Sequence, residues 1–147
     1  SSDLFAGDRE MMNWLLNQCF PAETHVLAVN RARVREVCER VGGGDAWEDA
    51  VVLAVNEACM NVIQHGYGPA GGGELLLRLG VDDDVFVVQL LDNGRPVADA
   101  DLRPRPLDEI RPGGLGVRFM RELMDDLAYI EAPAGFVNCL QLRKRIS

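Results

Sequence analysis

The sequence predicts an α/β (α+β) two-layer sandwich, in which a mixed, mostly antiparallel sheet is covered by helices. Three observations support this fold class. Two segments with helical spacing lie in the first half, two strand-like runs joined by an acidic turn follow, and a third helical segment precedes two more strand-like runs. At 147 residues the chain has the length of one domain, and we expect residues 1–147 to form a single domain.

The first half of the chain is predicted to contain one ambiguous segment and two helices. "MMNWLLNQCF" fits either a strand or a short helix. After Pro21, valines recur at roughly helical spacing until a glycine run, Gly42–Gly44, ends an amphipathic helix. These valines are Val26, Val29, Val34, Val37 and Val41. A second helix is predicted over residues 46–65, with Asp45 as its N-terminal cap and Gly66 as its stop.

The second half begins with a predicted antiparallel hairpin. "ELLLRLGV" and "VFVVQLLD" are strand-like runs joined by the acidic turn Asp82–Asp84. From Asn93 to Pro112 the pattern gives way to Pro, Arg and Asp, which indicates a functional lid or a disordered loop. "GGLGVRFMRELMDDL" restores helical spacing through Leu115, Phe119, Leu123 and Leu127. Two strand candidates, "AYIEA" and "FVNCLQLRKRI", follow, hinged at Pro133–Gly135.

Composition and charge exclude several classes of protein. The apolar share of 48% is that of a globular protein. No apolar run reaches the roughly 18 residues of a spanning helix and no basic-then-apolar leader opens the chain, so we expect a cytoplasmic protein that does not bind membranes. The net charge of −8 disfavours direct nucleic-acid binding and suits a basic protein partner. The four cysteines lack metal-ligand spacing, so zinc and a disulfide framework are poorly supported, and we expect buried free thiols.

A polar stripe interrupts the apolar stretch "VVLAVNEACMNVIQHGYG". Glu57, Asn61 and His65 are spaced i, i+4, i+8, so a helix would present them along one side. The stripe is either the solvated side of a half-buried helix or the lining of a cavity, and His65 can equally be a helix C-terminal residue. In the functional interpretation, Glu57 is a base and Asn61 an oxygen ligand for a hard cation such as Mg²⁺.

Two further motifs admit both a structural and a functional interpretation. "LLDNGRP" is either an Asn-Gly turn after a strand or a pocket in which Asp92 accepts from an exocyclic amine such as that of adenine, while Gly94 lets a flat ring approach the backbone. "RPGGLGVRFM" is either a flexible loop end or a glycine turn that leaves backbone N–H groups free for phosphate at a helix N-terminus. It is neither a P-loop nor a dinucleotide fingerprint.

The order of these motifs is more specific than any one of them. A Glu/Asn helix, a hairpin ending in Asp-x-Gly, a loop and a Gly-x-Gly helix start follow one another. In this order the sequence resembles the GHKL ATPases with the Bergerat nucleotide-binding fold, and within them the bacterial anti-sigma factor serine/threonine kinases. "NEACMNVIQHGYG" resembles the family's N box, "DNGRP" its first glycine box and "RPGGLGVRFMRELMDDL" its second. The resemblance runs from the helix after Pro21 to the last strand.

This resemblance implies a role for each motif residue. It implies that Glu57 activates an acceptor hydroxyl, that Asn61 holds Mg²⁺, and that Asp92 and Gly94 recognise adenine. It also implies that Gly114 and Gly116 contact the phosphates of ATP, that Gly113 and Leu115 belong to the same cofactor-binding segment, and that Arg111 is a candidate phosphate contact. Where the family often has Phe-Asp after the first glycine box, this chain has Val97 and Ala98.

We therefore expect a domain that binds ATP and Mg²⁺, sequesters a sigma factor and phosphorylates a Ser or Thr of an anti-anti-sigma partner. Because family members commonly dimerise, a homodimer is expected. One alternative is a nucleotide-dependent partner-switching module without kinase activity, against which Glu57 and Asn61 argue. The other is the catalytic ATP-binding domain of a histidine kinase, against which the lack of an upstream helical hairpin with a phosphoacceptor His argues.

Overall fold

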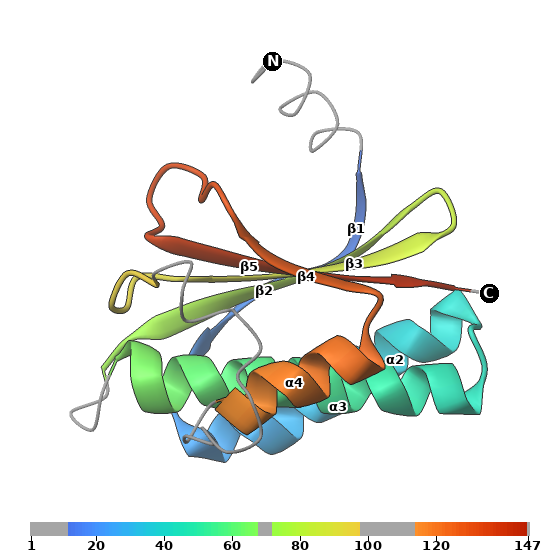
Figure 1. Ribbon diagram of the computed structural model, residues 1–147, viewed down its shortest axis with the longest axis horizontal. Helices are drawn as coiled ribbons and strands as arrows, with labels where there is room; N and C mark the ends of the chain where they lie inside the picture. Colours follow the sequence, from blue (N-terminus) through green and yellow to red (C-terminus); the bar gives the residue numbers. More distant parts are fainter. Residues whose placement is uncertain (1–11, 68–71, 98–113, 147) are drawn as a thin grey trace.

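The computed structural model describes residues 12–67, 72–97 and 114–146. Its strands are β1 (Asn13–Pro21), β2 (Glu74–Asp82), β3 (Val85–Asp92), β4 (Asp126–Ile130) and β5 (Asn138–Arg145), and its α-helices are α2 (Leu27–Val41), α3 (Asp45–Asn61) and α4 (Gly114–Leu123). The sheet has the order β1-β2-β3-β5-β4 with every neighbouring pair antiparallel, and the three helices lie on one of its faces (Figure 1). The predicted two-layer fold class is confirmed.

The N-terminal segment that was ambiguous in the sequence is a strand. β1 pairs along β2, with a shift of register between Trp14 and Leu16. The predicted hairpin of β2 and β3 is confirmed, and its acidic turn places Asp83 at a φ of 57°. Asp tolerates this left-handed conformation better than most residues do.

The first two helices follow the prediction except at their ends. A 3₁₀ turn, η1 (Thr24–Val26), leads into α2, which ends at Gly42 with a φ of 80°, as the glycine run indicated. The prediction that Asp45 caps the next helix is wrong, because Gly44 is the N-cap and Asp45 is the first helical residue. Its carboxylate still lies in the first turn, where it stabilises the positive end of the helix dipole.

The third helix is shorter than its apolar spacing predicted. α4 ends at Leu123, whereas Leu127 is buried in β4 and pairs with Leu142 of β5. The last turn of α4 is held by Lys144 of β5, whose Nζ donates to the carbonyl oxygen of Leu123 at 2.7 Å. This hydrogen bond satisfies one of the carbonyl groups that the end of a helix leaves without an intrahelical partner.

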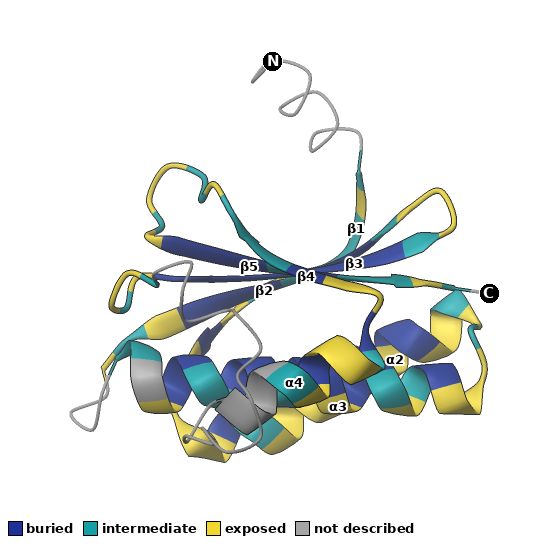
Figure 2. Ribbon diagram, in the orientation of Figure 1, coloured by how far each residue is buried: buried dark blue, intermediate teal, exposed yellow. Residues whose placement is uncertain are grey.

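The main core fills the space between the helices and the sheet. Figure 2 shows buried positions on the strands and on the sides of the helices that face them, with exposed positions on the outer sides of the helices. Alternate residues of the strands, such as Leu75, Leu77 and Leu79 of β2, belong to this core, as period-two packing requires. Trp47 meets Phe86 edge to face with ring centroids 5.2 Å apart.

A smaller apolar cluster of Leu76, Leu91 and Cys139 comes from the intervening strand positions. Three of the four free cysteines, Cys38, Cys59 and Cys139, are buried as expected, whereas Cys19 is exposed on β1 and corrects that expectation. None of the helices within the described ranges is long and apolar enough to cross a membrane.

Candidate functional site

The C-terminal half of α3 carries the first pair of predicted site residues. Glu57 and Asn61 are both half-buried, one α-helical turn apart, and they alternate with the fully buried Ala58, Cys59 and Val62. These two polar side chains therefore lie on the same side of α3, at the margin of the core rather than on its outermost surface. This position agrees with the lining of a site that is open to solvent on one side.

The α-helix that carries the predicted stripe does not extend to residue 65. α3 ends at Asn61, and residues Val62–Gly66 form a π-helical turn, η2. A π turn is wider than an α turn, so the regular α-helical spacing on which the i, i+8 prediction depended ends at residue 61. Single π turns inside helices occur often at functional sites, and no pattern in the sequence indicated this one.

The π turn brings the end of the helix against the turn that follows β3. The backbone N–H of Arg95 donates to the carbonyl oxygen of Gly66 at 2.8 Å. A Cβ added to Gly94 would lie 2.5 Å from the same oxygen, so a larger residue does not fit there. Gly94 was predicted to admit a flat ring, and the structure adds a second requirement: the backbones of two motifs meet at this glycine.

Asp92 is the last residue of β3 and is only 3% exposed. Its Oδ1 accepts from the backbone N–H of Gly94 at 2.8 Å and from Nδ2 of Asn138 at 3.0 Å. Within the described ranges, the hydrogen bonds to this carboxylate all converge on Oδ1. A buried carboxylate is costly unless its oxygens find donors, so the Oδ2 atom has the chemistry to accept from an amine of a bound ligand.

Asn138 was not identified from the sequence. It is the first residue of β5, 6% exposed, and it lies opposite Asp92 in the β3–β5 register. A strand pairing across 46 positions of sequence leaves no local signal. The only cue was that a polar residue opens the strand-like run "NCLQL".

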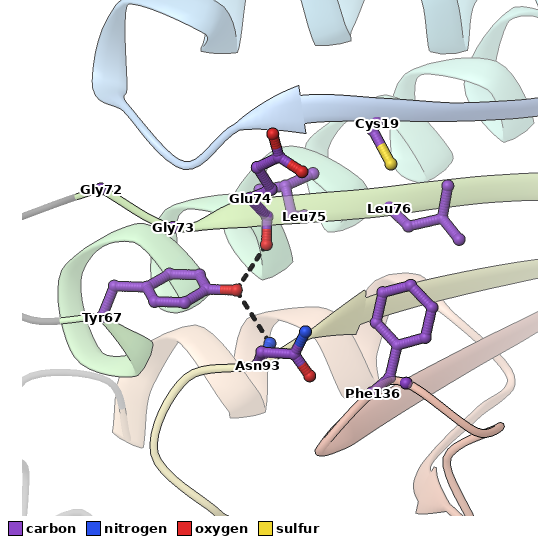
Figure 3. A pocket seen from close by; sticks show the side chains of 10 residues that line it. Cys19, Tyr67, Gly72, Gly73, Glu74, Leu75, Leu76, Asn93 and Phe136 are labelled. Carbon is purple, nitrogen blue, oxygen red and sulfur yellow. Dashed lines mark hydrogen bonds between the residues drawn. The ribbon is translucent and has the colours of Figure 1, made fainter.

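Tyr67 also forms hydrogen bonds to the turn that follows β3. Its hydroxyl donates to the carbonyl oxygen of Glu74 and accepts from the backbone N–H of Asn93, the latter at 2.8 Å (Figure 3). Tyr67 and Asn93 also line a cavity of about 420 Å³ with Cys19, Leu76 and Phe136. None of Glu57, Asn61 and Asp92 lines this cavity, so it is separate from the predicted site residues.

The third motif opens α4. Gly114, Leu115 and Gly116 form the first turn of this helix, which packs against α3 and runs antiparallel to it, so that its N-terminus lies toward the C-terminal half of α3 (Figure 1). The first N–H groups of a helix lack intrahelical partners and favour an anion. Two of the predicted residues, Arg111 and Gly113, lie outside the described residues. The same holds for the part of the predicted lid or loop, Asn93–Pro112, that follows Val97.

The residues present fit the two groups that the motifs imply. A half-buried carboxamide at Asn61 supplies one hard oxygen. An oxygen ligand of this kind fits Mg²⁺, which binds through few protein oxygens together with phosphate and water. The buried acceptor at Asp92 and the tight backbone at Gly94 fit a purine with an exocyclic amine.

Comparison with known proteins identifies the family of the chain. The sequence profile of the family described as "Histidine kinase-like ATPase domain" matches residues 20–144, and the chain belongs to this family. Among its relatives is the serine-protein kinase RsbW of Bacillus velezensis, 34% identical over 116 residues that cover 73% of this chain and 72% of RsbW. RsbW of Bacillus subtilis is similar to the same extent. The predicted family is confirmed.

Solved structures share the fold. A crystal structure of the RsbU and RsbW domains of a Mycobacterium tuberculosis protein superimposes with a TM-score of 0.58 at 18% identity, covering 88% of this chain and 32% of that one. The blue-light activated histidine kinase of Erythrobacter litoralis superimposes with a TM-score of 0.51 at 16% identity, covering 98% of this chain and 51% of that one. This chain thus spans only a third to a half of those two proteins.

Proposed function

We propose that this chain is an ATP-dependent serine/threonine protein kinase that acts as an anti-sigma factor, binding a sigma factor and phosphorylating an anti-anti-sigma partner. The observation that carries the proposal is the buried Asp92, held through Oδ1 at the point where the end of α3 meets the turn after β3. The RsbW relatives, which are named as serine-protein kinases, support the reaction class.

Each motif has one task in this proposal. Asp92 accepts the exocyclic amine of adenine through Oδ2, and the tight turn at Gly94 holds that carboxylate in place. Asn61 contributes a carboxamide oxygen to Mg²⁺, which neutralises phosphate charge when bound. The first-turn amides of α4 at residues 114–116 face the phosphates. The four groups come from three elements that pack together, so binding energy is available to position the γ-phosphate.

Glu57 is the proposed base for the acceptor hydroxyl. As the hydroxyl oxygen forms its bond to the γ-phosphorus, the bond from that phosphorus to the β–γ bridging oxygen breaks and ADP leaves. The hydroxyl proton passes to the carboxylate of Glu57. A half-buried position leaves Glu57 reachable by a partner's side chain while limiting its exposure to water. We also propose that the chain acts as a homodimer, as its resemblance to the family implies.

Phosphate transfer from radiolabelled ATP tests the kinase proposal, with each small anti-anti-sigma-like protein encoded beside the gene as acceptor. Glu57→Gln keeps the shape of the side chain and should lower the transfer rate by roughly 10²–10⁴-fold while ATP affinity stays within about twofold. Glu39→Gln, an exposed position on α2, is the matched control and should transfer at the parent rate. Transfer by Glu57→Gln at the parent rate, or none by the parent to any such partner, would leave a nucleotide-gated binding module as the function.

A further inference from the structure

Asn138 uses its whole carboxamide to organise the turn that carries Asp92. Its Nδ2 donates to Oδ1 of Asp92 and to the carbonyl oxygen of Arg95, both at 3.0 Å. Its Oδ1 accepts from the backbone N–H of Val97 at 3.1 Å. A side chain that is 6% exposed and satisfied on both ends is fixed in orientation, because any rotation would leave buried polar atoms unpaired.

The residue before it reinforces this arrangement. The backbone N–H of Val137 lies 3.0 Å from the carbonyl oxygen of Asp92 and 2.9 Å from Oδ1 of Asn93. The start of β5 therefore forms hydrogen bonds with the main chain of the turn as well as with the carboxylate of Asp92. Asp92 cannot shift relative to β5 without breaking several hydrogen bonds at once.

Two donors on the same oxygen determine which oxygen remains for a ligand. Gly94 N and Asn138 Nδ2 both donate to Oδ1 of Asp92. An ionised carboxylate only accepts hydrogen bonds, so a ligand group that meets Oδ2 has to be a donor. Adenine carries an amine at its six-position, whereas hypoxanthine and guanine carry a carbonyl oxygen there, whose lone pairs would repel the carboxylate.

We propose that Asn138 is a specificity-determining positioning residue, which selects adenine over 6-oxopurines by holding the Asp92 carboxylate with Oδ2 directed to the base. The inference rests on the proposed nucleotide site and deepens it. Asn138 acts through Asp92. Its loss should therefore change the preference between bases and leave the magnesium dependence of nucleotide binding unchanged.

The test compares ATP with ITP, in which a carbonyl at the six-position and a proton on N1 replace the amine and the unprotonated N1 of adenine. Dissociation constants are measured by isothermal titration for the parent, Asn138→Ala and Asn138→Ser. The ratio Kd(ITP)/Kd(ATP) should fall about tenfold or more in Asn138→Ala, which matches the loss of one hydrogen bond to a charged group. Asn138→Ser keeps one donor and should lose less of this preference. The magnesium dependence of ATP binding should stay at the parent value in both.

Gln141→Ala is the matched control on the same strand. Gln141 accepts from Nε2 of the buried Gln89 at 3.0 Å, on another rung of the β3–β5 ladder, so its loss removes an interstrand amide bond without touching Asp92. The control should keep the parent ratio. If Asn138→Ala weakens ATP and ITP equally, or leaves their ratio unchanged, Asn138 is only structural and the inference is wrong.

Asp92→Ala separates failure of the inference from failure of the site. If Asp92→Ala loses ATP affinity but Asn138→Ala keeps the parent ratio, the nucleotide site stands and the role of Asn138 is refuted. If Asp92→Ala binds ATP like the parent, the assignment of the base pocket fails, and the inference fails with it. Thermal unfolding of each variant establishes that it is folded; if Asn138→Ala is not, the same ratio measured on Asn138→Ser decides.

Discussion

The backbone of Gly94 lies against the carbonyl of Gly66, joining the turn after β3 to the end of the π turn that follows α3. Two of the three motifs singled out in the sequence therefore touch through main-chain atoms. No side chain can be inserted between them, because a Cβ on residue 94 would lie 2.5 Å from the Gly66 oxygen.

Gly94→Ala should accordingly damage both stability and nucleotide binding. The backbones must separate to admit the methyl group, at a cost of about 1–3 kcal/mol in the free energy of unfolding. Gly42→Ala is the control, since Gly42 has a φ of 80° and open space around its Cβ position. It should cost a similar 1–2 kcal/mol through backbone strain alone, with ATP affinity unchanged. Urea unfolding and isothermal titration measure the two quantities, and equal ATP affinity in Gly94→Ala and the parent would contradict this prediction.

Asp92→Ala should weaken ATP binding by about one to two decades, because the adenine amine is left buried without an acceptor at a cost of roughly 1–3 kcal/mol. Asp84→Ala removes an exposed carboxylate from the hairpin turn at the other end of β3 and serves as the control for charge. Isothermal titration with ATP decides the matter. An Asp92→Ala protein with the affinity of the parent would show that adenine is recognised elsewhere.

Asn61→Ala should abolish the dependence of ATP affinity on magnesium, since a metal ligand acts before any chemistry. Titrations with ATP are run with Mg²⁺ and with a chelator. The parent should bind more tightly with Mg²⁺, and Asn61→Ala should bind equally in both conditions. Glu57→Gln is the neighbouring control one turn earlier on α3 and should keep the dependence. If the ATP affinity of Asn61→Ala depends on Mg²⁺ as strongly as that of the parent, the metal is bound by other ligands.

Cys59 should make the protein lose stability in alkali. Burial raises the pKa of its thiol to about 12, although the hydrogen bond from Asn30 acts in the opposite direction. In the unfolded chain the thiol ionises near its ordinary pKa of about 8.5. Between these values the unfolded state loses a proton that the folded state keeps. Cys59 should therefore contribute a fall of about 1.4 kcal/mol per pH unit in the free energy of unfolding from roughly pH 9 upward.

The measurement for Cys59 is urea unfolding at several pH values for the parent and for Cys59→Ala. The variant should be less stable near pH 7, because it leaves a small cavity, but its stability should decline less steeply above pH 9. Cys19→Ala, at an exposed thiol, should keep the slope of the parent. Parallel pH profiles for the parent and Cys59→Ala would show that this thiol does not contribute to the alkaline loss.

The parts of the fold that the sequence predicted are those whose pattern is local. The period-two runs of the hairpin and the valine spacing of α2 each lie within one element, and glycine ended α2 where expected. Leu127 shows the limit of such a pattern. Four-residue spacing continues through it, but the neighbour that matters is Leu142 on β5, which draws Leu127 into a strand. Tertiary pairing overrides local periodicity at that position.

The site shows the same division between local and distant information. Glu57, Asn61, Asp92 and Gly94 lie in short motifs, so residue type and spacing singled them out. Asn138 acts across a strand pair and stands in no motif of its own, so only the β3–β5 register reveals it. The contact of Gly94 with Gly66 was hidden for the same reason, since a backbone approach leaves no side chain to recognise.

Hydrogen bonds at the two ends of β5 set the distance between two parts of the proposed site. Asn138 near its start holds the carboxylate proposed for the base, and Lys144 near its end holds the last turn of α4, the helix whose first turn is proposed for the phosphates. The two residues are six positions, or about 20 Å, apart along an extended strand and face the same side of the sheet. A one-residue shift in the register of β5 would move the side chains of Asn138 and Lys144 to the other face of the sheet. Insertions within the strand should therefore abolish nucleotide binding altogether, whereas insertions in the hairpin turn at Asp82–Asp84 should be tolerated.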